Sequence, residues 1–123
     1  MTAPETPAAP EIPDVDLATF TLAGAADFGD RPALIDGPTG RTISFAELAQ
    51  QVDALAGALA ARGIGHGDVV AIYMPNLPEY AVVFHGVLRA NAVLTTVNSL
   101  YTAGELAAQL ADCRARMLSL IHI

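Results

Sequence analysis

The feature that most constrains the fold is a continuous apolar run from Val69 to Tyr73. Such a run is typical of a strand buried on both faces, as in parallel sheets. A helical pattern follows over 80–89, a strand pattern over 92–97, a helical pattern over 106–113 and a last strand from Met117. This order makes two βαβ units that share a strand. Right-handed crossovers would place all three strands in one parallel sheet, so the sequence predicts an α/β fold.

The residues before this unit predict a short helix, a hairpin and a long helix. Asp16 can cap a helix over 17–26. Two short apolar runs, 33–35 and 41–45, flank the turn signal DGPTG, which indicates a β-hairpin.

The long helix is expected over 45–62. Ser44 and Glu47 have the spacing of a capping box, and apolar residues recur afterwards at helical intervals. Gly63 is expected to end this helix in the left-handed conformation.

Two further helix starts follow. Asn76 is expected to cap the helix at 80–89, with Glu79 reaching back as in a capping box. That helix is apolar almost all round, so we expect burial on most sides. Thr102 and Glu105 form a third capping box. The buried face of the last helix is expected to carry Leu106, Leu110 and Cys113.

The composition suggests that this α/β unit is incomplete. The 123 residues are 53% hydrophobic and 15% charged, whereas soluble domains have about 25% charged residues. Three parallel strands do not complete a domain either. We therefore expect an incomplete N-terminal subdomain with a β-hairpin and consecutive βαβ units. Its bare sheet edge and apolar helix face would make it aggregation-prone.

Charge and cysteine content exclude several classes of function. The net charge is -7, and all six basic residues are scattered arginines, which argues against nucleic-acid binding. Without lysine, no Schiff-base chemistry resides here. The single Cys113 allows no internal disulfide, and it is either a small core residue or a reactive thiol. The best apolar run, 81–88, is too short for a membrane span, and no signal peptide is visible, so we expect a cytoplasmic protein.

The two ends of the chain differ from its middle. Residues 1–15 are expected to be a disordered leader with proline at every third position, either solvated or a ligand for a proline-binding domain. Residues 16–117 are expected to form the ordered domain. The hexapeptide 118–123, LSLIHI, matches the translation of a common transposase sequencing adapter. We hypothesise that it is adapter sequence; an ordinary apolar strand is the alternative.

Chemistry is expected at the carboxyl ends of the strands, where open α/β sheets bind ligands. Asn98, Ser99 and Tyr101 follow one such strand, so they either border a pocket or serve the loop and the helix cap. The glycines at 63–67 follow a helix and precede a strand, the wrong context for a phosphate loop. The three histidines lack the spacing of a metal pair. We therefore assign no catalytic and no metal-binding residue.

Five segments, in order, resemble motifs of one enzyme superfamily. They are TISFAEL at 42–48, GIGHGDVVAI at 63–72, MPNLPEY at 74–80, LRANAV at 88–93 and VNSLYTAGEL at 97–106. The region 31–117 resembles the start of the adenylate-forming (AMP-binding) superfamily. Its members include acyl-CoA and 4-coumarate–CoA ligases, luciferases and peptide-synthetase adenylation domains. The NSLYT form favours 4-coumarate–CoA ligase-like and fatty acyl-CoA ligases.

The resemblance implies a two-step reaction for the parent enzyme. A carboxylic acid attacks ATP to give an acyl-adenylate and pyrophosphate, with Mg²⁺ assisting, and the thiol of CoA then displaces AMP. The family's ATP, Mg²⁺ and CoA motifs lie downstream of this region. We therefore expect no cofactor on this chain alone, and no activity. Asn91 stands where the family usually has glycine, which implies a left-handed residue.

Two other interpretations remain open. One is a natural short α/β interaction module that docks through its uncovered sheet. The other is a nucleotide-binding Rossmann-type domain without ligase activity, although its glycine fingerprint is missing. The sequence does not indicate which carboxylic acid the parent activates.

Overall fold

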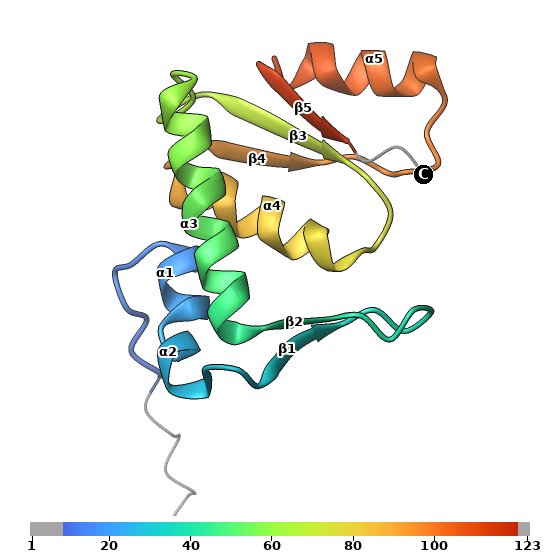
Figure 1. Ribbon diagram of the computed structural model, residues 1–123. Coiled ribbons are helices and arrows are strands. Elements are labelled where there is room, and N and C mark those ends of the chain that lie inside the picture. The colour runs from blue at the N-terminus through green and yellow to red at the C-terminus, as the bar shows by residue number, and fades with distance from the viewer. Residues whose placement is uncertain (1–8, 121–123) are drawn as a thin grey trace, which may run out of the picture.

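The computed structural model describes residues 9–120, in two β-sheets and five helices (Figure 1). Residues 1–8 of the expected leader and 121–123 of the terminal hexapeptide lie outside the described residues. The elements in chain order are α1 (Leu17–Leu22), α2 (Ala25–Phe28), β1 (Pro32–Ile35), β2 (Thr42–Ser44), α3 (Phe45–Ala61), β3 (Val69–Tyr73), α4 (Pro78–Arg89), β4 (Val93–Thr96), α5 (Ala103–Asp112) and β5 (Met117–Leu120).

The three C-terminal strands form a parallel sheet in the order β4-β3-β5, as the strand–helix alternation predicted. The central strand β3 is buried from Val70 to Ile72. The connection from β3 to β4 and the connection from β4 to β5 run across the sheet in opposite directions. Right-handed crossovers therefore put α4 and α5 on opposite faces, as Figure 1 shows.

The face of the sheet under α4 carries the main core. Leu59 of α3, Val70 of β3 and Val87 of α4 are buried together in one cluster. Helices α3 and α4 approach closely at Gly86, where a Cβ atom would lie 2.7 Å from Leu55 Cδ2. Every residue of α4 is at least half-buried, which confirms the prediction made from its apolar circumference.

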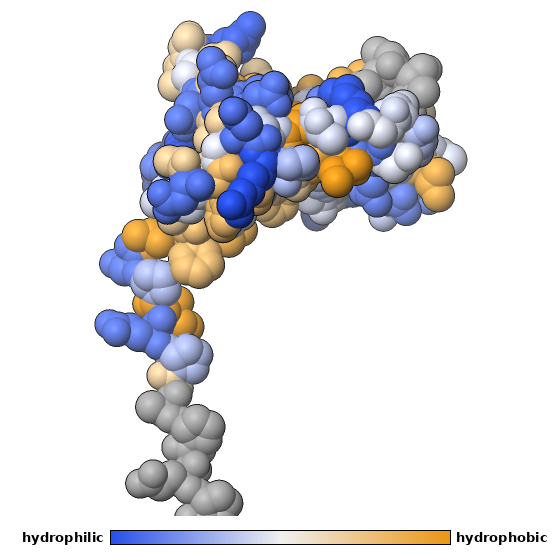
Figure 2. Space-filling view, turned by 60° about the horizontal axis from the view of Figure 1, so that its bottom comes forward, coloured by the Kyte–Doolittle hydropathy of each residue, from blue (hydrophilic) through white to orange (hydrophobic). Residues whose placement is uncertain are grey.

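The hairpin and the two short helices pack on the N-terminal half of α3. Strands β1 and β2 pair antiparallel, as predicted. Ile43 of β2 joins Leu22, Leu48 and Val52 in a second buried cluster. Figure 2 shows apolar residues along the described part of the leader and near its junction with the body. The exposed residues there are Ile12, Val15, Leu17 and Phe20.

Several local predictions are confirmed. Asp16 caps α1 by accepting a 2.8 Å hydrogen bond from the backbone N–H of Thr19. Ser44 and Thr102 each form the expected capping box, with Glu47 and Glu105. Gly63 has φ 71° and Asn91 has φ 58°, so both end their helices in the left-handed region.

Two predictions of helix limits are wrong. The chain bends at Ala23 and Gly24, so the helix expected over 17–26 is divided into α1 and α2. Asn76 does not cap α4, because the N-cap is Leu77 and makes no side-chain hydrogen bond. Glu79 does not close a capping box there, because its carboxylate binds Arg41 of the hairpin.

The last helix is less covered than predicted. Leu106, Leu110 and Cys113 share one side of α5, but each is only half-buried, and no residue of Ala103–Asp112 is buried. The prediction of a buried face is therefore wrong in degree. The physical reason is that this side of α5 faces a sheet of three short strands, which covers it only in part.

Candidate functional site

Two neighbouring strands send their connections to opposite faces of the sheet. The chain leaves β3 toward α4 and leaves the adjacent β4 toward α5. Connections that diverge in this way open a crevice at the carboxyl ends of the strands, where α/β sheets bind ligands. The loops at this edge are residues 74–77 and 97–102.

Hydrogen bonds hold the second of these loops in place. The phenol of Tyr73, at the end of β3, donates to the carbonyl oxygen of Tyr101 at 3.0 Å. The side-chain amide of Gln109, on α5, donates to the carbonyl oxygen of Thr96 at 3.0 Å. The loop is thus tied to the central strand on one side, and the end of β4 is tied to α5 on the other.

An open hollow of about 740 Å³ lies between this edge and α5. Its lining residues are mainly polar: Thr96, Asn98, Tyr101, Glu105, Ala108, Gln109 and Asp112. Asn98 and Tyr101 therefore both line this hollow, whereas Ser99 is not among the lining residues. Asn98 also serves its own loop, because its Oδ1 accepts a 3.0 Å hydrogen bond from the N–H of Leu100.

The hollow has acidic character. Hydrogen bonds from the backbone N–H and the hydroxyl of Thr102 lower the pKa of Glu105, so this carboxylate stays ionised well below neutral pH. None of the residues that line the hollow is basic. These residues do not fit the phosphates of a nucleotide, which require positive charge or a row of backbone donors.

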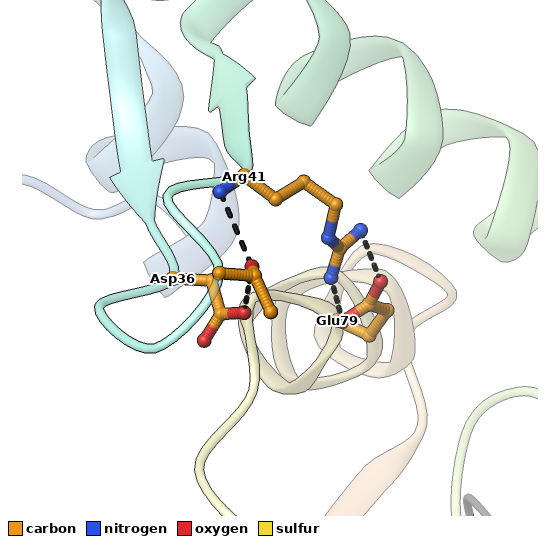
Figure 3. Close-up of polar contacts among 4 residues, drawn as sticks. Asp36, Arg41 and Glu79 are labelled. Atoms are coloured by element: carbon orange, nitrogen blue, oxygen red, sulfur yellow. Dashed lines mark hydrogen bonds and ion pairs between the residues drawn. The ribbon is translucent and has the colours of Figure 1, made fainter.

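A second groove lies between the hairpin turn and the start of α4. Its volume is about 280 Å³, and Ile35, Pro38, Asn76 and Leu77 are among its lining residues. Beside it, two nitrogens of Arg41 bind the two carboxylate oxygens of Glu79 at 2.6 and 2.8 Å (Figure 3). This ion pair lowers the pKa of Glu79 and ties the hairpin to α4.

Two further polar side chains make contacts within their own helix. His85 Nδ1 lies 2.8 Å from the carbonyl oxygen of Ala81, within α4. The half-buried Cys113 is the C-cap of α5, and its Sγ lies 3.6 Å from the carbonyl oxygen of Leu110. Within the described residues, no group of three or more His, Cys, Asp or Glu side chains could hold a metal ion.

Sequence reasoning missed the α5 wall of the hollow. Glu105, Gln109 and Asp112 have i, i+4 and i+7 spacing, so they share one side of the helix. The sequence shows this polar side of the helix, but it does not show which surface lies opposite. The fold places it beside β4.

Comparison with known proteins decides the family. The sequence model described as "AMP-binding enzyme" matches residues 22–120. The chain belongs to this family. A 4-coumarate–CoA ligase of Pinus taeda is 36% identical over 114 residues. The probable CoA ligase CCL9 of Humulus lupulus is 42% identical over 106 residues.

These matches span only part of the relatives. They cover 88% and 85% of this chain but 21% and 20% of the two ligases, respectively. The chain therefore spans about a fifth of the length of the curated relatives it matches. Among the helices of residues 9–120, none combines the length and the hydrophobicity that a membrane span requires.

Solved structures agree on the fold. The N-terminal subdomain of Klebsiella oxytoca NpsA, in complex with 3-hydroxyanthranilyl-AMSN, superposes with a TM-score of 0.79 at 30% identity. This match covers 88% of this chain and 27% of the NpsA chain. The mixed α/β architecture with its small hairpin is thus that of the N-terminal subdomain of adenylate-forming enzymes.

Proposed function

We propose that this chain is the amino-terminal part of an ATP-dependent acyl- or aryl-CoA ligase. The observation that carries the proposal is the match to ligases at 36–42% identity over nearly all of this chain and only a fifth of theirs. In the proposed reaction a carboxylate attacks ATP, giving an acyl-adenylate and pyrophosphate. The thiol of CoA then forms a thioester and releases AMP.

In this proposal the chain supplies part of the scaffold and one border of the pocket that binds the carboxylic acid substrate. Asn98, Ser99 and Tyr101 form the pocket-edge loop, and the Tyr73 hydrogen bond holds that loop against the central strand. ATP, Mg²⁺ and CoA would be held by other parts of the enzyme. The acidic hollow beside α5 does not fit a triphosphate, and the chain contains no lysine. We therefore derive no catalytic step within these residues.

The chain alone should not form an adenylate. This follows because none of the residues at the carboxyl edge of the sheet can neutralise the charge that develops on the phosphates. Incubation of the purified chain with ATP, Mg²⁺ and 4-coumarate should release no pyrophosphate above background. Release at a rate proportional to the chain concentration would overturn this part of the proposal.

The test of the parent identity is to sequence the source locus beyond the codon for Met117. We expect the frame to continue into a Ser/Thr/Gly-rich loop that ends in lysine, with codons for 118–123 replaced by other sequence. A frame that stops after Ile123 in intact source DNA would overturn both the ligase and the adapter proposals. The interaction-module interpretation would then be the better one.

A further inference from the structure

The turn of the hairpin carries a reactive residue pair that the proposed ligase function does not use. Asp36 is the only aspartate of the sequence that a glycine follows, and the pair opens the DGPTG turn between β1 and β2. Attack of the glycine backbone nitrogen on the aspartate carboxyl closes a five-membered succinimide ring. Glycine favours ring closure because it has no Cβ atom to restrict the backbone or shield the nitrogen.

The backbone nitrogen of Gly37 is accessible. Gly37 is exposed, and a Cβ atom built on it would meet no atom within 4 Å. The N–H of Asp36 donates to the carbonyl oxygen of Arg41 at 2.8 Å, and the N–H of Gly40 donates to the carbonyl oxygen of Asp36 at 2.7 Å. The N–H of Gly37 makes no hydrogen bond with any residue in 9–120. The turn therefore closes without using the nitrogen that would react.

Thr39 holds the carboxylate of Asp36 over the same turn. The Thr39 hydroxyl accepts a 3.2 Å hydrogen bond from the N–H of Arg41 and donates to Oδ2 of Asp36 (Figure 3). Because Thr39 lies three residues after Asp36, this second bond folds the carboxylate back over residues 37–38. It also places a proton donor on an oxygen of the group that must lose water when the ring closes.

We propose that Asp36 is a site of isoaspartate formation in the folded protein, with Thr39 as the positioning residue. The Gly37 nitrogen bonds to Cγ of Asp36, and one carboxyl oxygen leaves as water with the amide proton and a proton from solvent. Water then opens the succinimide. Attack at the main-chain carbonyl gives isoaspartate, and attack at the side-chain carbonyl restores aspartate. The two steps need no oxidant and no cofactor.

Isomerisation would change the hairpin. The main chain would gain the Cβ methylene of residue 36, and the carbonyl that accepts the N–H of Gly40 would become a carboxylate outside the main chain. The turn that presents Arg41 to Glu79 would therefore lose one of its closing hydrogen bonds. The reaction does not require ligase activity, so its failure would leave the proposed function untouched.

The test ages the purified 123-residue chain at neutral pH and follows isoaspartate over time. A carboxyl methyltransferase specific for isoaspartate, supplied with labelled S-adenosylmethionine, measures the total amount. The protease Asp-N cuts before aspartate but not before isoaspartate, so a peptide that continues through residue 36 should accumulate. The other aspartates are internal controls, since none precedes a glycine. Absence of isoaspartate at residue 36, or equal amounts at the other aspartates, would overturn the proposal.

Glycine substitutions test the role of the nitrogen. Gly37→Ala should slow isoaspartate formation by about fivefold or more, because the new Cβ atom restricts the backbone and shields the nitrogen. The fold should tolerate this change, since the site is open. Gly57→Ala is the matched control: this glycine is also exposed, has no atom within 4 Å and does not follow an aspartate. It should leave the rate unchanged. Equal rates in the two variants would contradict attack by the Gly37 nitrogen.

Two substitutions of Thr39 separate its position in the fold from the local sequence. Thr39→Val removes the hydroxyl and should slow isoaspartate formation in the folded chain by about threefold or more. Thr39→Ser keeps the hydroxyl and should preserve the rate. In the urea-unfolded chain all three forms should react alike, because the hydrogen bond to Asp36 is absent. Equal folded-state rates for threonine and valine would reject the positioning role. A folded-state rate far below the unfolded rate would show that the fold protects Asp36, and it would overturn the proposal.

Discussion

The two faces of the parallel sheet are covered by helices of very different burial. On one face, α3 buries Leu48, Val52, Ala56 and Leu59, and α4 packs between α3 and the sheet. On the other face, α5 buries none of its residues from Ala103 to Asp112. One face of the sheet is thus covered by a buried core with two layers of helices, while the other is covered by one exposed helix.

Helices α3 and α5 nevertheless begin and end with the same kinds of capping structure. Both α3 and α5 begin with a complete capping box, and both end in a left-handed residue, Gly63 and Arg114. Helix formation therefore does not explain the difference in burial. What differs is whether the described chain provides a second layer, and only α3 has one, in α4 and the hairpin.

The largest expected difference in unfolding free energy comes from truncating one leucine side chain on each face of the sheet. Leu59→Ala removes a buried residue of the core cluster and should cost about 2–5 kcal/mol of unfolding free energy. Leu110→Ala removes a half-buried residue and should cost less than about 1.5 kcal/mol, because solvent already reaches the site. Urea unfolding measures both. Equal losses would show that α5 is as tightly packed as α3.

Glycine-to-alanine substitutions should change the stability of the protein in opposite directions on the two faces of the sheet. Gly86→Ala places a Cβ 2.7 Å from Leu55, so overpacking of about 1–3 kcal/mol should exceed the helix-propensity gain of about 1 kcal/mol. Gly104→Ala meets no atom within 4 Å and should stabilise by up to about 1 kcal/mol. Thermal melts compare them. A stabilised Gly86→Ala variant would mean that α3 and α4 separate easily.

Removal of the caps should distinguish global from local stability. Ser44→Ala and Thr102→Ala each delete one capping hydroxyl, worth about 1 kcal/mol. The Ser44 change should lower the unfolding free energy of the whole chain. The Thr102 change should instead accelerate hydrogen exchange within α5 and leave the global transition nearly unchanged. A global loss from Thr102→Ala would show that α5 folds with the core.

The smallest effect concerns pH at the junction of β3 and β5. Arg116 donates a 2.8 Å hydrogen bond to the carboxylate of Asp68, and the backbone N–H of Gly65 donates to the same carboxylate, so the pKa of Asp68 is lowered from its usual value. The stabilisation is therefore fully present above the unfolded-state pKa of Asp68 and is lost as pH falls through the lower, folded-state pKa.

Asp68→Asn should remove that part of the acid dependence, and Arg116→Gln should reduce it, in unfolding curves taken between about pH 2 and 6. The effect should be small, because Arg116 is largely exposed to solvent. An unchanged pH profile in both variants would contradict the role of this ion pair.

The polar edge of the sheet shows how far sequence reasoning reached. The rule that ligands bind at strand ends directed attention to Asn98 and Tyr101, and both line the hollow. The α5 wall was missed because Glu105 was interpreted only as a helix cap. Glu79 was misassigned for a related reason. Its spacing fits a capping box, but Arg41, which is 38 residues away, binds its carboxylate.

The sequence by itself determined the order of elements, the parallel sheet, the hairpin and the left-handed residues Gly63 and Asn91. These depend on residue periodicity, caps and backbone sterics, which act over a few neighbouring residues. Only the tertiary structure decided that α5 would stay exposed and that Glu79 would pair with the hairpin. Burial and ion pairing depend on which surfaces meet, and residues far apart in the chain supply those surfaces.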